Sequence, residues 1–276
     1  MDAINDVSDW KQFVGKVDDL RASLARSPTP LLFQGQGNSE WPLATTLDRS
    51  GAVGMLFRSY YELICARMGP EVQTFSDIDV PPYDPKKAEL DFKNLELLSF
   101  PGLFPDVALY RYMAYLRHLG FPSPLLDWSR SPFVAAFFAF RDEPLVKVGK
   151  RSIYAYCEMP EGHKGGAVGA PTIHAIGPYI QTHHRHFRQR CDYTICGRFD
   201  VDSKEWRFDS HQAIFDHRNP GQDALWKFDL PSSERATVLR ALSDYNLNAF
   251  SLFGSEESLL ETMWLREYVL RKGLSD

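Results

Sequence analysis

The stretch HLGFPSPLLDWSRSPFVAAFFAF, residues 118–140, decides the fold of this chain. Its glycine and prolines rule out a regular helix at the start, because proline fixes φ and removes a hydrogen-bond donor while glycine frees the backbone. Ser131 followed by Pro132 predicts a helix start, since serine caps helices well and proline fits the first helical position. Residues 133–140 are apolar on every side, which is typical of a buried helix. We therefore interpret the stretch as a loop that leads into a helix at the centre of the molecule.

Asp127 is the polar residue of this stretch that most needs a partner. A carboxylate between Leu126 and Trp128 is costly to bury unless it accepts hydrogen bonds from the backbone or pairs with an arginine. We expect Asp127 to cap the helix entrance or to form such a pair, and not to act as a catalytic acid.

Length and composition limit the classes of protein to which the chain can belong. The chain has 276 residues, of which 44% are hydrophobic, and a formal net charge of −5. A chain of this size buries roughly three quarters of its unfolded surface, so one domain over residues 1–276 needs no disulfide or metal to fold. The acidic balance argues against a protein that coats nucleic acid through bulk charge. The four cysteines form no CxxC pair, and no apolar run is long enough to cross a membrane, so we expect a cytoplasmic protein with reduced thiols.

The remaining pattern mixes helices with short strands. Hydrophobic residues spaced three and four apart, or capping residues, predict helices at 7–26, 54–67, 90–98, 107–119, from 231 onward and at 255–272. Short β-branched and aromatic runs predict strands at 31–33, 153–157, 193–196 and 224–230. Residues 69–85 are rich in proline, aspartate and serine and predict an exposed connector. The class is therefore α+β.

A glycine-rich segment, residues 34–38, follows the first predicted strand. Its backbone amides could approach a phosphate, although it lacks the lysine of a P-loop and the spacing of a dinucleotide fingerprint. A plain turn is the alternative. Arg49, further along, is by the same reasoning either a ligand-binding group or an ordinary surface arginine.

Residues 183–198, HHRHFRQRCDYTICGR, concentrate three histidines and four arginines. A zinc site made by His183, His186, Cys191 and Cys196 is one interpretation, but the spacings match none of the familiar four-ligand patterns, so we expect no metal. A basic lip that binds pyrophosphate or a nucleic-acid backbone is a second interpretation. A solvated loop is the third.

Three segments taken together resemble the FRG domain, a family named for its Phe-Arg-Gly motif. The family opening is matched by FQGQGNSEWPLATTLDR at 33–49, its central block by residues 118–139, and its later block more loosely by RHFRQRCDY at 185–193. The chain departs from the family at three places. Gln34 stands where the family has its naming arginine, Ser-Pro at 123–124 replaces Thr-Arg, and Arg-Cys at 190–191 replaces Gln-Gly.

The motif order of the family is similar to that of ADP-ribosyltransferases, and this resemblance implies a fold and a site. The fold would be an ADP-ribosyltransferase-like split β-sheet with helical insertions, whose core motifs lie at 31–49, 118–140 and 185–196. NAD would be the substrate. The catalytic residues would be Gln34, Ser129, Gln189 and Asp192, with Glu256 and Glu257 left open as alternatives for the acidic position. The residues that bind NAD would be Phe33, Gly35, Gln36, Arg49, Ser123 and Arg188.

The chemistry explains why such residues would be needed. Breaking the bond between nicotinamide and ribose develops an oxocarbenium cation, which a nearby carboxylate or amide stabilises. The acceptor would be RNA, DNA or protein, and the protein would be a toxin effector of anti-phage or toxin–antitoxin defence with an antitoxin as partner. A non-catalytic module that binds a nucleotide or a partner is the alternative, and Gln34 favours it. A nuclease-like hydrolase is a third, although the sequence carries no metal-binding carboxylate cluster.

Overall fold

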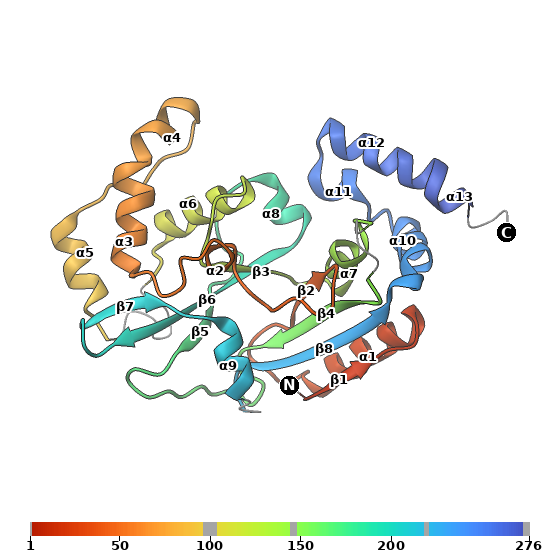
Figure 1. Ribbon diagram of the computed structural model, residues 1–276, viewed down its shortest axis with the longest axis horizontal. Helices are drawn as coiled ribbons and strands as arrows, with labels where there is room; N and C mark the ends of the chain where they lie inside the picture. The colour runs from red at the N-terminus through yellow and green to blue at the C-terminus, as the bar shows by residue number, and fades with distance from the viewer. Residues whose placement is uncertain (1, 96–103, 144–147, 218–220, 273–276) are drawn as a thin grey trace.

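One mixed sheet organises the molecule, as seen in a computed structural model that describes residues 2–95, 104–143, 148–217 and 221–272. Within these residues eight strands form a single hydrogen-bonded sheet in the order β1-β8-β4-β2-β3-β6-β5, with β7 paired to β6 (Figure 1). The strands are β1 (Asp2–Asp6), β2 (Leu32–Gln36), β3 (Leu125–Ser129), β4 (Lys150–Cys157), β5 (Thr172–Ala175), β6 (Cys191–Asp200), β7 (Glu205–Phe208) and β8 (Ala224–Pro231). All neighbours are antiparallel except β1 and β8.

The sheet narrows at its centre to one residue pair. Strands β2 and β4 are in register over five residues, and so are β3 and β6, whereas β2 and β3 meet only at Phe33 and Ser129. The sheet therefore consists of two halves, β1-β8-β4-β2 and β3-β6-β5 with β7, joined at this pair. The α+β class is confirmed, and the ADP-ribosyltransferase-like form of it stays a prediction.

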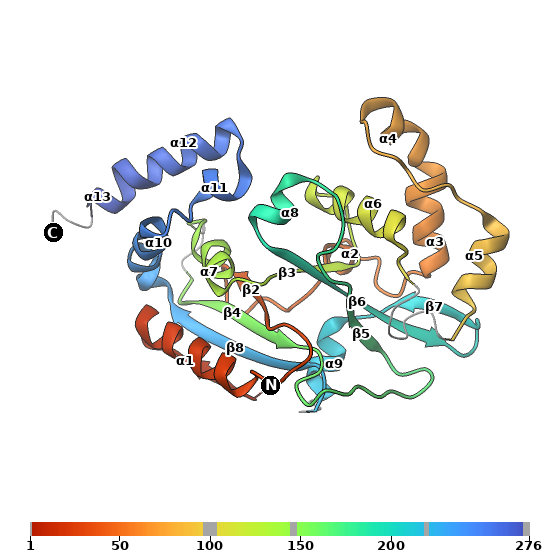
Figure 2. The same cartoon turned by 180° about the vertical axis from the view of Figure 1, so that it is seen from behind.

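Helices cover one face of both halves. One half packs against α1 (Trp10–Ser23), α7 (Pro132–Phe140) and α10 (Arg235–Asp244), and the other against α3 (Phe57–Tyr61), α5 (Pro85–Phe92) and α6 (Val107–His118) (Figure 2). The opposite face carries a smaller apolar cluster around Trp128 and Tyr156, closed by Leu43 and by α9 (His211–His217).

Helix α7 is the buried helix that the opening stretch predicts. The side chain of Ser131 accepts a hydrogen bond from the N–H of Val134, and Pro132 follows it in the first turn, so the predicted start is confirmed. The helix lies directly on β2: a Cβ added to Gly35 would stand 1.8 Å from the carbonyl oxygen of Ala135. Glycine is required at position 35 because the two backbones touch.

Several predictions of local structure are wrong. Residues 34–36 continue β2 instead of forming a glycine loop, and the segment read as a loop before α7 contains β3. Both segments are strands because neighbouring strands satisfy their backbone groups, which the local sequence does not reveal. The connector at 69–85 contains α4 (Gly69–Phe75), and the helix at 54–67 is α3 followed by a π-helical turn, Glu62–Arg67.

Three other predicted helices are present, and several further elements were not predicted from the sequence. The predicted helices 7–26 and 107–119 are α1 and α6, and 255–272 is α12 (Glu256–Trp264) continued by a π-helical turn (Leu265–Val269) and α13 (Leu270–Lys272). Residues 96–98 of the helix predicted at 90–98 lie outside the described residues. The missed elements are β1, β5, β7, α2 (Thr46–Arg49), α8 (His184–Arg188), α9 and α11 (Ala249–Phe253). No helix in the described part of the chain is long and apolar enough to cross a membrane.

Candidate functional site

Three of the predicted catalytic residues, Gln34, Ser129 and Asp192, lie on the neighbouring strands β2, β3 and β6. Paired residues of antiparallel strands point to the same face, and side chains alternate along each strand. Phe33 pairs with Ser129, and Trp128 pairs with Asp192. Gln34 and Asp192 therefore share the face that carries Trp128, whereas the side chain of Ser129 points to the helix-covered face.

A hydrogen bond between Ser129 and Gln189 links the end of β3 to the turn before β6. The hydroxyl of Ser129 donates to the carbonyl oxygen of Gln189 at 2.7 Å and accepts the N–H of Ser131 at 3.1 Å. The side-chain amide of Gln189 donates to the carbonyl oxygen of Leu252 at 3.3 Å. Both residues are buried. In this geometry they position the strand ends that carry the site.

Asp192 is a buried carboxylate held by Arg130, which was not among the predicted site residues. Arg130 donates to one carboxylate oxygen of Asp192 from Nε at 3.0 Å and from Nη2 at 2.9 Å. The other oxygen accepts the N–H of Tyr193 at 3.0 Å. Burial raises the pKa of the Asp192 carboxyl, and the paired guanidinium opposes the rise. The side chain of Asp192 is 1% exposed. A ligand can therefore contact this carboxylate only if Arg130 moves away; otherwise it contacts Arg130 instead.

Arg130 reaches the surface from this buried pair. Its side chain is 30% exposed, and its guanidinium carbon lies 5.9 Å from the centroid of the Tyr179 ring. Its backbone N–H donates to the carbonyl oxygen of Arg190, whose side chain is exposed. The side chain of Arg188 is also exposed, and its guanidinium lies against Gly254. A planar, partly exposed guanidinium such as that of Arg130 is suited to bind the oxygens of a phosphate.

Gln34 and Gln36 present two buried amide oxygens on the same face as Asp192. Neither oxygen has a hydrogen-bond partner among the residues that the structure describes. The amide nitrogen of Gln36 donates to the carbonyl oxygen of Pro42 at 3.3 Å, so its oxygen is the free end. A buried acceptor without a donor is costly, and a bound hydroxyl or amide would remove that cost.

Three of the residues predicted to bind NAD are packed inside the protein. Phe33 is 1% exposed and belongs to the apolar cluster under α7, and Gly35 touches the backbone of that helix. Ser123 is fully buried, where its hydroxyl accepts the N–H of Leu125 and its own N–H donates to Thr46. The structure does not bring these three to an open surface.

Asp127 pairs with an arginine, which is one of the two roles predicted for it, and it does not cap α7. Its carboxylate forms an ion pair with Arg117, while Ser131 caps α7. Burial raises the pKa of Asp127, and the charges of Arg117 and Arg49 oppose the rise. Arg49 is itself exposed and donates to the carbonyl oxygen of Ala44 at 2.8 Å.

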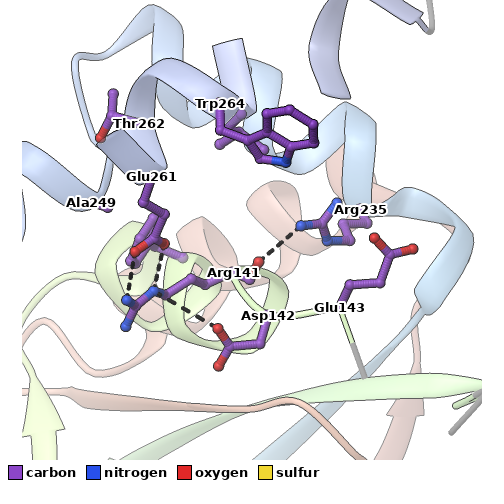
Figure 3. A pocket seen from close by; sticks show the side chains of 10 residues that line it. Arg141, Asp142, Glu143, Arg235, Ala249, Glu261, Thr262 and Trp264 are labelled. Atoms are coloured by element: carbon purple, nitrogen blue, oxygen red, sulfur yellow. Dashed lines mark hydrogen bonds and ion pairs between the residues drawn. The ribbon is translucent and has the colours of Figure 1, made fainter. Parts of the chain in front are cut away.

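A cavity of about 240 Å³ lies between the end of α7 and α12 (Figure 3). Arg141 binds both carboxylate oxygens of Glu261 there, each at 2.6 Å, and Arg235 donates to the carbonyl oxygens of Phe140 and Arg141. These polar groups satisfy one another. The cavity contains none of the predicted site residues, and we assign it to packing between the helices.

A second cavity, of about 350 Å³, borders a buried charge network that the sequence did not reveal. Lys164 contacts Glu158 at 3.2 Å and Asp223 at 2.7 Å, and the hydroxyl of Tyr156 donates to Asp223 at 2.6 Å. No fixed spacing links these residues, so no sequence motif could have identified them. The network joins the ends of β4 and β8 to the loop at 160–171.

Comparison with known families agrees with the resemblance seen in the sequence. Residues 29–146, which include β2, β3, α6 and α7, match the family model of the FRG domain. No curated protein and no solved structure is significantly similar to the chain.

Proposed function

From the FRG domain that this chain carries over residues 29–146, we propose that it binds NAD beside β2, β3 and β6 and acts as an ADP-ribosyltransferase. The observation that supports the proposal is the Arg130–Asp192 pair. It holds a carboxylate on the same face as the unpaired amide oxygens of Gln34 and Gln36 and exposes a guanidinium at the surface.

In the proposed binding step, the pyrophosphate of NAD competes with Asp192 for the guanidinium of Arg130. Arginine binds phosphate oxygens in the same forked geometry as it binds a carboxylate. Binding would thereby release the carboxylate of Asp192 towards the ribose.

In the proposed chemical step, the bond between C1′ of the ribose and the nicotinamide nitrogen breaks, and its electron pair leaves with nicotinamide. The positive charge left on the ribose is stabilised by Asp192, and the hydroxyl of the ribose can donate to the amide oxygen of Gln34. An oxygen or nitrogen of RNA, DNA or protein then bonds to C1′ and loses its proton.

The proposal predicts that Asp192→Asn lowers the transfer of labelled ADP-ribose from NAD by about 100-fold, the usual effect of removing one electrostatic stabiliser. Asparagine keeps the acceptor for Tyr193 and removes the charge. Asp209→Asn is the matched control, because Asp209 pairs with Arg198 at 2.9 Å outside the site and its substitution should leave transfer unchanged.

Gln34→Arg restores the residue of the family motif and should increase transfer. If neither the wild-type protein nor Gln34→Arg consumes NAD or transfers label, the enzymatic proposal is wrong.

A non-catalytic nucleotide-binding module is the second candidate, because Asp192 is neutralised by Arg130 and Gln34 carries no charge. Calorimetry separates the two candidates. A module binds NAD without consuming it, binds more weakly after Arg130→Gln, and is unaffected by Arg198→Gln.

A role as a toxin effector would follow from transferase activity in the cytoplasm, where the four free cysteines would stay reduced. Expression of the wild-type chain should then arrest bacterial growth, and Asp192→Asn should relieve the arrest. The fraction that carries the label, RNA, DNA or protein, identifies the acceptor, and an antitoxin would be recognised as the partner that prevents the arrest.

A further inference from the structure

Three side chains with metal-binding atoms converge beneath the start of β6. They come from the last residue of α6, His118, from α8, His186, and from the first residue of β6, Cys191. Their ligand atoms all lie within 4.8 Å of one another. Helices α6 and α8 lie next to each other above this end of β6 in both views of the molecule (Figure 1, Figure 2).

His186 is oriented as a metal ligand would be. Its Nε2 lies 3.0 Å from the carbonyl oxygen of Pro178, and a carbonyl oxygen only accepts, so Nε2 carries the proton. The lone pair is then on Nδ1, which faces the cluster. Histidines that bind metals commonly fix their tautomer by donating the other ring N–H to a backbone carbonyl. His186 is also 1% exposed, so its ring is held firmly.

The hydroxyl of Tyr193 completes the cluster. It lies 2.9 Å from Nε2 of His118 and 3.5 Å from Nδ1 of His186. Tyr193 and Cys191 point to the same face because they are two residues apart on β6. The cluster therefore offers two imidazole nitrogens, one thiol sulfur and one phenol oxygen in a buried space.

We propose that His118, His186 and Cys191 bind a zinc ion, with the hydroxyl of Tyr193 at the fourth position. Two imidazoles and a thiolate suit zinc, whose bonds are about 2.0–2.1 Å to nitrogen and about 2.3 Å to sulfur. Tetrahedral bonds of these lengths place ligand atoms roughly 3.3–3.8 Å apart. The three ligand atoms lie within 4.8 Å of one another, and the hydroxyl of Tyr193 would have to move slightly away from His118. On binding, Cys191 releases its proton to solvent, and the three ligands tie α6 and α8 to β6.

The proposed site differs from the zinc site considered from the sequence. Cys196 lies five residues along β6 from Cys191 and points to the opposite face, in the apolar cluster with Trp128. His183 lies at the rim, with its ring centroid 6.0 Å from that of His118. His118 takes part in the site although it is far from the other ligands in sequence.

Cobalt titration of the protein, purified with reduced thiols and stripped of metal, tests the proposal. We expect one cobalt ion per chain, with the charge-transfer absorption of a thiolate ligand, and displacement of cobalt by one zinc ion. Cys191→Ser should lose the charge-transfer band, and His118→Gln should weaken binding. Cys196→Ser is the matched control, because this cysteine is buried on the same strand but faces away, and it should keep the band.

A wild-type protein that binds no stoichiometric cobalt or zinc overturns the proposal, and the cluster is then only hydrogen-bonded. A band that survives in Cys191→Ser, or that is lost in Cys196→Ser, also overturns it. The wild-type titration decides the question even if a variant fails to fold. The readout does not depend on NAD, so the site can be present whether or not the protein is a transferase.

Discussion

Trp128, Thr194 and His211 form a buried chain of hydrogen bonds. The indole N–H of Trp128 donates to the hydroxyl oxygen of Thr194 at 2.8 Å. The hydroxyl oxygen of Thr194 in turn lies 2.9 Å from Nε2 of His211. Nδ1 of His211 is buried without a hydrogen-bond partner among the described residues. Burial lowers the pKa of His211 to about 3.

This low pKa predicts a loss of stability in acid. In the unfolded chain a histidine has a pKa near 6.5. Between pH 6.5 and 3, His211 is therefore protonated in the unfolded chain but neutral in the folded protein. The contribution of His211 is fully present above pH 6.5 and falls as pH falls, by about 2 kcal/mol at pH 5. His174, whose pKa burial lowers to about 4, acts in the same direction.

The measurement is urea unfolding at pH 7 and pH 5 for the wild type and for His211→Gln. Glutamine offers Thr194 an acceptor but does not titrate, so its free energy of unfolding should change less between the two pH values. An equal change in both proteins would contradict the assignment of a low pKa to His211.

At the scale of elements, the contact between β2 and α7 depends on Gly35. A Cβ there would meet the carbonyl oxygen of Ala135 at 1.8 Å and the backbone nitrogen of Ala139 at 2.7 Å. These atoms belong to the backbone of α7, which cannot move aside as a flexible side chain would. We expect Gly35→Ala to lower the free energy of unfolding by about 3 kcal/mol, the upper part of the usual range for overpacking.

Gly37→Ala is the control for this prediction, because the nearest atoms to its added Cβ stand at 3.9 Å. Its effect on the urea midpoint should be small. If the two alanine variants are equally stable, β2 and α7 are not in direct backbone contact. The same experiment bears on the site, since a shift of β2 would move Gln34 and Gln36.

At the scale of the whole molecule, the matched FRG segment should not fold without the rest of the chain. Residues 29–146 contain β2 and β3, which share only the pair Phe33 and Ser129. Their longer partners, β4 and β6, lie at 150–157 and 191–200, outside the segment. The fragment would leave two strand edges open and the inner face of α7 partly uncovered.

Expression of residues 29–146 and of the full chain, followed by limited proteolysis and amide NMR, checks this expectation. The full chain should resist protease and give dispersed amide signals, and the fragment should do neither. A protease-resistant, dispersed fragment would show that the segment is a domain in itself and would contradict the prediction of one domain over residues 1–276.

The sequence by itself determined the features that depend on neighbours along the chain. The start of α7 at Ser131 and Pro132, the length of α6 and the α+β class follow from capping, periodicity and composition, which are local. The family resemblance also rested on short motifs. The sequence limited Asp127 to a helix cap or an arginine pair, because a buried carboxylate needs a partner, but it did not identify Arg117 as that partner.

Only the tertiary structure decided which distant groups meet. Residues 34–36 and 125–129 are strands because β4 and β6 pair with them, and a strand's partner is not encoded in its own residues. Arg130 meets Asp192, which lies 62 positions further along the chain, and His118 meets His186 and Cys191, for the same reason. The sequence shows which chemical groups are present, but the pairing of strands decides which of these groups become neighbours.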